Sequence, residues 1–356
     1  MLPFIILLLV PIVIQHIGIK GVDYQKKNRF ALAFFFVLLT FLVMFRHKSV
    51  GNDTRNYIHF FEEFSRMDWS KLRNLTIEVG YAYLNKFVSI ISSNPQFFLA
   101  VAAVAVSAMI FPTYKRLCRD SSLTIVLFCA LSTFVMMFSG IRQMLAIGLG
   151  FVAYEFTRNK KFIAFLLCVA IAMLFHSSAF MLLLMYPLYH ARITKKWLLI
   201  VVPAMVVVFV FNRQIFGVLT LILQKFSRFD GQLGSTGAFT MLLLFIIFAV
   251  FAYLIPDEKT MDAETIGLRN FLLLSIAVQL FAPLHNLAMR MNYYYIIFIP
   301  LLLPKVIAFR RDRYDRLAIA GRNIMIVFFL IYFFINAYKG GSLNVFPYHF
   351  FWENVA

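Results

Sequence analysis

One arginine interrupts a long apolar stretch of this chain, in the sequence Ser139-Gly140-Ile141-Arg142-Gln143. The runs on either side, 121–138 and 144–156, are apolar enough to span a bilayer. A guanidinium in hydrocarbon is so costly that such cations face a wet cavity or a partner. A Ser-Gly step permits a helix break, and the freed backbone groups must line a cavity. We therefore predict that Arg142 points into a solvated pocket at one membrane face, with snorkelling to the interface as the alternative.

Other ionisable side chains fall at the same predicted face, and each also has a purely structural interpretation. Asp53 precedes a helical pattern, where it is either a functional carboxylate or a helix cap. Glu78 precedes Gly80-Tyr81 and is either a functional carboxylate or an ordinary solvated acid in a loop. His176 is either a functional histidine or a hydrogen-bonded histidine of the core. Arg290, which follows His285-Asn286 in the chain, is otherwise an anchor at the boundary of the next span.

These residue types together suit transfer from a lipid diphosphate. Guanidinium groups pair bidentately with phosphate oxygens, and a helix that begins after Gly140 adds backbone N–H donors. A carboxylate in the same pocket accepts the proton of an attacking hydroxyl. The sequence contains no HExxH, no DxD pair, no Cys/His cluster and no Walker loop. We therefore predict a reaction that needs no metal and no cofactor.

The composition defines the class of protein. The chain has 356 residues, of which 62% are hydrophobic and 14% charged, whereas soluble domains are about 45–50% apolar. We predict an all-α polytopic membrane protein, a single transmembrane domain over 1–356 with about 11–12 transmembrane helices, several of them short or broken. The candidate spans are 2–18, 29–45, 96–113, 121–138, 142–157, 162–175, 177–190, 197–211, 239–256, 268–284, 290–308 and 322–338.

The basic residues indicate the orientation. The net charge of +18 is explained by Lys and Arg gathered in alternate short gaps between the spans, without recourse to nucleic acid. The positive-inside rule places these gaps in the cytoplasm, and both termini and the candidate site outside. The basic gaps include 20–29, 115–119, 158–161, 192–196 and 305–322.

Two longer segments fall on the predicted outer side. Segment 46–95 carries apolar residues at helical spacing, which predicts an external loop with an interfacial amphipathic helix. Segment 212–238 contains Gly231, Gly234 and Gly237 and is predicted to be a lid-like loop. The apolar residues of the first segment that share a helical face are Tyr57, Phe60, Phe61, Phe64 and Met67.

The order of four motifs resembles the EpsG family of bacterial polysaccharide polymerases, of the broader Wzy type. The resemblance covers about the first half of the chain; beyond 190 it rests on hydropathy and Arg290. Asn52 stands where many relatives have threonine, and Asp53 is kept. The motifs are Gly51-Asn52-Asp53-Thr54-Arg55-Asn56-Tyr57, Glu78-Val79-Gly80-Tyr81, Ile141-Arg142-Gln143 and Phe175-His176-Ser177-Ser178-Ala179.

The resemblance implies a GT-C-like fold in the bacterial plasma (inner) membrane, with the active site facing the periplasm or exterior. It implies that oligosaccharide repeat units linked to undecaprenyl diphosphate are joined there, making O-antigen, capsule or exopolysaccharide. Membrane lipid surrounds the enzyme, and a chain-length regulator and a flippase are its expected partners.

The expected roles follow. Arg142 and Arg290 bind the diphosphate, and His176 assists at phosphate or protonates the leaving group. Of Asp53 and Glu78, one deprotonates and one orients the acceptor hydroxyl, with a slight preference for Glu78 as the base. Weaker candidates for substrate binding are Arg55, Tyr57, Tyr81, Gln143, His285 and Asn286.

Two other functions compete. A membrane acyltransferase would use His176 as its base, but the predicted outer location of His176 does not suit cytoplasmic acyl-CoA. A transporter or flippase of lipid-linked oligosaccharide needs polar groups through the full membrane depth and often carries internal repeats. The ionisable residues here cluster on one side and no repeat is visible.

Overall fold

The computed structural model describes residues 1–17, 23–131, 133–223, 237–311, 316–339 and 343–355. The chain is nearly all helical, at 78%, and the described residues contain no strand, only an isolated bridge between Arg46 and Phe350. The all-α polytopic membrane class predicted from composition is confirmed. Two compact units are recognised: residues 1–183 with 316–356 form unit 1, and residues 184–315 form unit 2.

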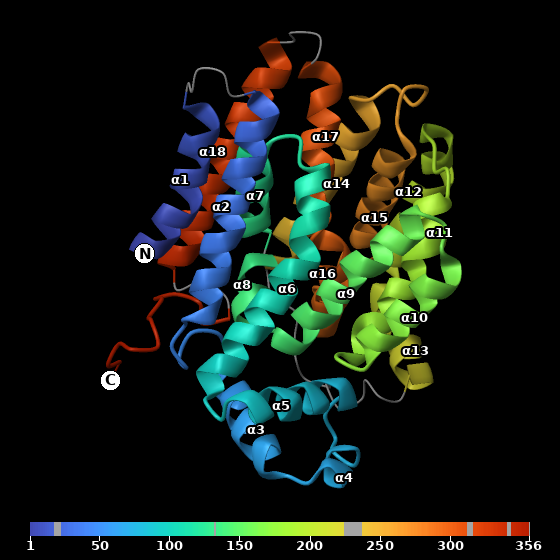
Figure 1. Cartoon of the computed structure of the whole chain (residues 1–356). Coiled ribbons are helices and arrows are strands. Elements are labelled where there is room, and N and C mark those ends of the chain that lie inside the picture. The colour runs from blue at the N-terminus through green and yellow to red at the C-terminus, as the bar shows by residue number, and fades with distance from the viewer. Residues whose placement is uncertain (18–22, 132, 224–236, 312–315, 340–342, 356) are drawn as a thin grey trace. The chain divides into compact units, whose positions relative to one another are not determined.

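Unit 1 contains the N-terminal helices and the last one (Figure 1). They are α1 (Leu2–His16), α2 (Tyr24–Met44), α3 (Thr54–Arg66), α4 (Trp69–Leu72), α5 (Val79–Ile91), α6 (Pro95–Leu117), α7 (Ser121–Ala130), α8 (Thr133–Ser139), α9 (Ile141–Arg158), α10 (Phe162–Met173), the 3-10 helix η1 (Ser177–Leu184) and α18 (Arg316–Tyr338).

Unit 2 contains the remaining helices. They are α11 (Met185–His190), the short 3-10 helix η2 (Lys195–Trp197), α12 (Leu198–Val210), α13 (Asn212–Leu223), α14 (Gly237–Leu254), α15 (Ala263–Gln279), α16 (Asn286–Ile296) and α17 (Ile299–Arg311).

Helices long and apolar enough to cross a membrane are α2, α6 and α18 among the described residues. Bent pairs raise the number to six if each pair is one span: α7 with α8, η2 and α12 with α13, and α16 with α17. The helices α1, α10 and α14 are apolar but shorter. Short and broken spans were expected from the sequence, and the break after Ser139 is the one that shapes the candidate site.

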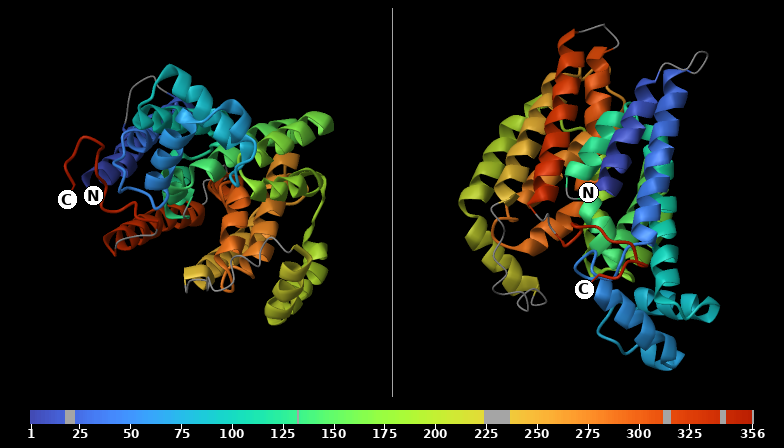
Figure 2. Two further views of the ribbon diagram at one scale, coloured as in Figure 1. Left: turned by 90° about the horizontal axis from the view of Figure 1, so that it is seen from below. Right: turned by 90° about the vertical axis from the view of Figure 1, so that its left-hand side faces the viewer.

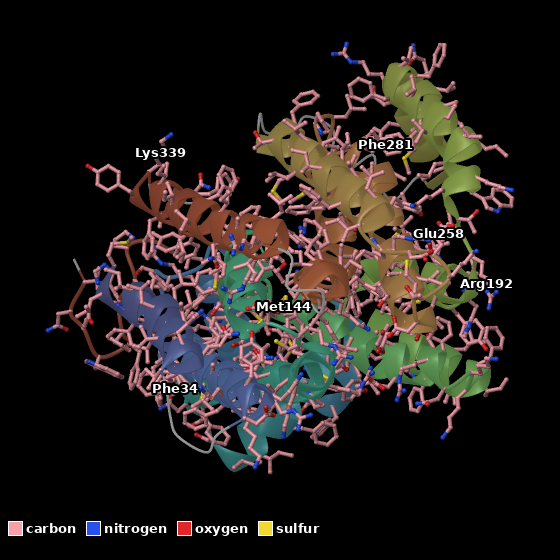
Figure 3. The ribbon with its side chains drawn as sticks, turned by 90° about the horizontal axis from the view of Figure 1, so that it is seen from above. Phe34, Met144, Arg192, Glu258, Phe281 and Lys339 are labelled. Carbon is pink, nitrogen blue, oxygen red and sulfur yellow. The ribbon has the colours of Figure 1, made fainter. Side chains whose placement is uncertain are left out.

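The core of unit 1 is built around α6, which packs against α2 and α9. Small buried residues on α6, Ala102 and Ala103, allow the helices to approach closely. Aromatic rings fill the rest, as where Tyr114 meets Phe36 with ring centroids 5.4 Å apart. Met144 of α9 is buried in the middle of this packing (Figure 3).

The helices α3, α4 and α5 form a small layer at one end of unit 1 (Figure 1). The predicted amphipathic helix is α3, whose buried face carries Tyr57, Phe61 and Phe64. Phe61 stacks on Phe98 of α6 with ring centroids 5.2 Å apart. This aromatic contact fixes the layer to the end of α6.

The C-terminal segment is bound to the loop between α2 and α3. His47 N–H donates to His349 O over 2.8 Å, and Gly51 N–H donates to Asn344 O over 2.9 Å. Phe346 packs on Phe4 of α1 with centroids 4.8 Å apart, so both chain ends lie on the same side of unit 1 (Figure 2).

Unit 2 is centred on α15, which packs against α11, α14, α16 and α17. Its buried Arg269 lies 3.9 Å from the ring centre of Tyr253 and pairs with Glu258 at 3.5 Å. Residues 212–223 of the predicted lid-like loop are helical as α13, and α14 begins at Gly237. The rest of that segment, 224–236, lies outside the described residues.

A buried polar network closes the other end of unit 1, away from the α3–α5 layer. Arg322 of α18 donates to both oxygens of Asp120, over 2.5 and 3.0 Å. Gln15 of α1 donates to the same carboxylate over 3.3 Å and to Asn28 of α2. One carboxylate at the start of α7 therefore joins α1, α7 and α18, and Asn28 adds α2.

We expect Arg322→Leu to lower the free energy of unfolding by about 3 kcal/mol or more, because it leaves Asp120 buried without its cation. The double variant Asp120→Leu with Arg322→Leu should recover most of that loss. Thermal unfolding of the purified protein in detergent measures both. Equal losses in the single and double variants would contradict a paired-charge role.

Candidate active site

The predicted helix break is present next to Arg142. Helix α8 ends at Ser139 and α9 begins at Ile141, with Gly140 at the N-cap and no side chain capping the new helix. Ser139 and Gln143 are buried, whereas the side chain of Arg142 keeps 26% of its surface exposed. The guanidinium therefore lies in a partly open position beside a helix N-terminus, which favours anions.

Glu78 joins Arg142 to a second segment. The Arg142 Nη1 donates to Glu78 Oε2 over 2.5 Å. The other oxygen, Oε1, accepts the Ser177 N–H over 3.2 Å. Glu78 thus joins two sequence motifs that lie 64 residues apart, its own and that of Arg142. It also joins both to the turn that follows α10.

The start of α5 is held in place by Gly80. Its N–H donates to Leu174 O over 2.8 Å, and a Cβ at this position would lie only 2.8 Å from the same oxygen. Glycine is therefore required for the close approach of α5 to the end of α10. That approach sets the position of Glu78, two residues earlier.

Two tyrosines surround the arginine. The Arg142 guanidinium carbon lies 5.9 Å from the ring centre of Tyr81, within cation–π range. Tyr57 packs edge-on against Tyr81 with centroids 5.8 Å apart and accepts a hydrogen bond from Arg142. Both were weaker candidates from the sequence, and both belong to the Arg142 cluster.

The charge state of Glu78 follows from these neighbours. Burial raises its pKa, but the adjacent Arg142, the backbone N–H donors and His176 outweigh burial and hold the pKa below its usual value. Glu78 is therefore ionised at neutral pH and already paired with a guanidinium. A general base is most effective when its pKa lies near the working pH, so this arrangement suits orientation of Arg142 better than proton abstraction.

His176 lies in electrostatic range of Glu78, and Asp53 directly precedes α3, the helix that carries Tyr57. His176 is buried, and its Nδ1 hydrogen-bonds Ser178 Oγ over 2.7 Å. Asp53 occupies the N-cap position of α3 as predicted, but its side chain makes no capping bond to α3. Arg55, in the first turn of α3, is exposed.

The loop that carries Asp53 is fixed by Gly51. Its φ of +88° lies in the region that favours glycine, and a Cβ would lie 2.5 Å from Phe138 O. The loop therefore contacts the last turn of α8, directly before the break that exposes Arg142. This contact brings the first and third motifs of the sequence together.

The remaining candidates belong to unit 2 and lie on or next to α16. The His285 Nδ1 caps α16 by accepting the Leu287 N–H over 3.0 Å, and its ring stacks on Phe216 at 5.6 Å. Asn286 is the first residue of α16, and Arg290 lies one turn further along. A structural role as a cap therefore accounts for His285.

One further residue of the site was missed by sequence reasoning, namely Arg46. It lies directly after α2 in the loop that leads to Gly51 and is fully buried. The signal was an arginine immediately after an apolar run, the same signal that identified Arg142. Among the described residues, no group of three or more His, Cys, Asp or Glu side chains is arranged to hold a metal ion.

The fold and the site together define a polytopic helical membrane protein with an arginine cluster at one end of its helices. The chain belongs to the EpsG family, whose model matches residues 29–350. The match extends well beyond residue 190, where the motif resemblance ended. No curated protein and no solved structure matches the chain. The family consists of Wzy-type polysaccharide polymerase-like membrane proteins, so a polysaccharide polymerase-like role is supported in general terms.

We expect Gly80→Ala to reduce both stability and activity. The added methyl must push α5 away from Leu174, and overpacking of this kind costs about 1–3 kcal/mol. Gly321→Ala in α18 is the matched control, because a Cβ there meets nothing within 4 Å. Thermal unfolding of both variants measures the difference. If Gly80→Ala were as stable as Gly321→Ala, the close contact would not be required.

Proposed function

We propose that this protein is a metal-independent glycosyltransferase that joins oligosaccharide repeat units linked to polyprenyl diphosphate at the outer leaflet of the bacterial plasma membrane. The donor is the growing chain on undecaprenyl diphosphate, and the acceptor is a hydroxyl at the non-reducing end of another lipid-linked repeat. The observation that carries this proposal is Arg142, held by Glu78 at the uncapped N-terminus of α9.

Binding of the diphosphate is assigned to Arg142 and to the first N–H groups of α9. A guanidinium donates two parallel hydrogen bonds to phosphate oxygens. As the bond from the sugar to the diphosphate breaks, negative charge grows on the leaving oxygen. Fixed donors that stabilise developing charge are often the largest catalytic term. Arg290 is proposed, from the sequence, as a second phosphate-binding residue.

The proton transfer is assigned to Asp53. The acceptor hydroxyl attacks the anomeric carbon, the hydroxyl proton passes to the carboxylate, and the lipid diphosphate departs. Glu78 is already occupied by Arg142 and the Ser177 N–H, which favours a positioning role for it. His176, in electrostatic range of Glu78, is proposed to assist at the leaving phosphate.

A transport function is less well supported by unit 1. After Gln143, the buried residues of α9 are apolar as far as Ala153 and include Met144, Leu145 and Ile147. A flippase needs a polar path for the glycan through the membrane depth. An apolar middle of α9, with Arg142 and Gln143 at its start, suits a reaction at one leaflet.

We expect purified protein in nanodiscs to convert a synthetic polyprenyl-diphosphate-linked repeat unit into a ladder of polymer on a gel. The assay contains excess chelator and no nucleotide sugar. Arg142→Ala should reduce the rate by about 100-fold or more, the usual effect of removing one charge-stabilising donor.

Arg66→Ala, which removes an exposed arginine at the end of α3, is the matched control and should leave the ladder intact. A ladder of normal length and rate from folded Arg142→Ala would overturn the assignment. Movement of the lipid-linked unit across the bilayer without polymer would favour the flippase. A product that requires an acyl donor would favour the acyltransferase.

A further inference from the structure

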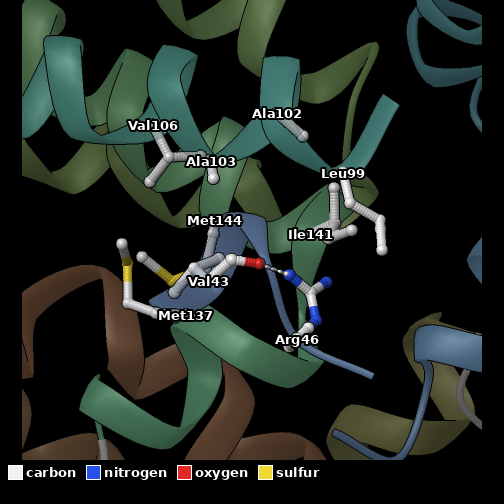
Figure 4. Close-up of a pocket in the computed structure, with 9 residues that line it drawn as sticks. All are labelled: Val43, Arg46, Leu99, Ala102, Ala103, Val106, Met137, Ile141 and Met144. Atoms are coloured by element: carbon white, nitrogen blue, oxygen red, sulfur yellow. Dashed lines mark hydrogen bonds between the residues drawn. The ribbon is translucent and has the colours of Figure 1, made fainter. Parts of the chain in front are cut away.

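Arg46 is a buried cation whose hydrogen bonding is incomplete. Its Nε donates to Thr54 Oγ1 over 3.2 Å and its Nη1 donates to the Val43 carbonyl. Nη2 is buried and meets no hydrogen-bond partner in the part of the chain that the structure describes. Figure 4 shows the guanidinium at the edge of a small cavity, bonded to Val43.

The positive charge of Arg46 is buried, and no carboxylate among the described residues lies beside it to compensate it. The side chain has 0% exposed surface, and an arginine remains charged at neutral pH. The groups that act on it electrostatically are the hydroxyls of Tyr57, Tyr81 and Tyr348, and no described carboxylate pairs with it. A buried charge without a counter-ion is strongly destabilising. Features that break the rules of stable folding in this way are expected at functional sites.

The adjacent cavity does not supply the missing partner. Its space for the centre of a water molecule is about 10 Å³, close to the least that holds one water. The lining is apolar apart from Arg46 and includes Leu99, Ala102, Ile141 and Met144. A phosphate does not fit there, so any anion that compensates Arg46 lies on its other side.

On the side away from the cavity, Arg46 is connected to Arg142 through residues that both arginines share. The Tyr81 ring centre lies 5.9 Å from the Arg142 guanidinium carbon and 5.8 Å from the ring centre of Tyr57, and both tyrosines also act electrostatically on Arg46. Thr54, which bonds Arg46, also lies 3.4 Å from Phe138 O at the end of α8. Glu78 balances the charge of Arg142, whereas no carboxylate in the described part of the chain balances that of Arg46. Of the two arginines that share these tyrosines, Arg46 is therefore the one whose charge no described carboxylate offsets directly.

We propose that Arg46 is a positioning residue that makes the site prefer a lipid diphosphate to a lipid monophosphate. Its charge acts across Tyr57 and Tyr81 on the second negative charge of the bound diphosphate. Arg142 does not neutralise that second charge, because it is already paired with Glu78. This inference rests on the proposed function, because it takes the ligand to be a polyprenyl phosphoanhydride. Arg46 contributes long-range charge and contacts no reacting atom.

The test compares equilibrium binding of polyprenyl diphosphate and polyprenyl monophosphate of equal chain length to the full protein in nanodiscs. Wild-type protein should bind the diphosphate about tenfold or more tightly than the monophosphate. An interaction between two unit charges inside a partly buried site changes affinity by about that factor. In Arg46→Met the ratio should fall to within about twofold. Arg46→Lys, which keeps the charge, should retain much of the preference.

A purely structural role for Arg46 would predict a lower thermal midpoint in Arg46→Met, and our proposal predicts otherwise. Removal of an uncompensated buried charge should leave the thermal midpoint of ligand-free Arg46→Met unchanged or higher. Thr54→Val removes the bond to Nε but keeps the charge, so it should lower stability and retain the preference.

Three outcomes would overturn the inference: no preference in wild-type protein, an unchanged ratio in Arg46→Met, or a loss of preference in Thr54→Val equal to that in Arg46→Met. A preference that depends on Arg46, in protein that makes no polymer, would instead refute the polymerase assignment and leave this inference standing.

Discussion

The ion pair between Glu78 and Arg142 connects the parts of unit 1 from which the site is made. One carboxylate oxygen accepts from the guanidinium at the start of α9, and the other accepts the Ser177 N–H after α10. Glu78 itself is placed by the tight contact of Gly80 with Leu174. Three chain segments are thereby fixed around one partly exposed arginine. Without the carboxylate, this long and flexible side chain would keep only its contacts with Tyr57 and Tyr81 to orient it.

The two ends of unit 1 differ in how completely their charged side chains are paired. At one end, Asp120 and Arg322 are nearly fully buried and bond each other through two hydrogen bonds, with Gln15 adding a third to the carboxylate. That arrangement satisfies both charges and leaves nothing for a ligand. At the other end, Arg142 is partly exposed, and Arg46 has no carboxylate partner among the residues that the structure describes. The first arrangement is typical of a structural network, and the second is typical of a site completed by an anion.

Local signals in the sequence predicted local structure well. The Ser139-Gly140 step predicted the break before α9, and the spacing of Tyr57, Phe61 and Phe64 predicted α3, because periodicity and breakers act over a few residues. The pairing of Glu78 with Arg142 was not predicted, because nothing in a single sequence records which distant side chains meet. Arg46 was missed because its full burial, and the lack of a carboxylate partner among the described residues, are properties of the three-dimensional packing. The EpsG membership found over 29–350 confirms the motif resemblance and extends it to the second half of the chain.

The central claim is that Glu78 serves to hold Arg142 and that Arg142 binds the substrate, and exchange of the two charges tests it most directly. Each single reversal, Glu78→Arg or Arg142→Glu, places like charges together and should lower the thermal midpoint. The double reversal should restore the midpoint to near the wild-type value, since the ion pair forms again. It should not restore polymer formation, because a carboxylate then occupies the position at the α9 N-terminus that the diphosphate needs. Polymer made at the wild-type rate by the double reversal would contradict the account.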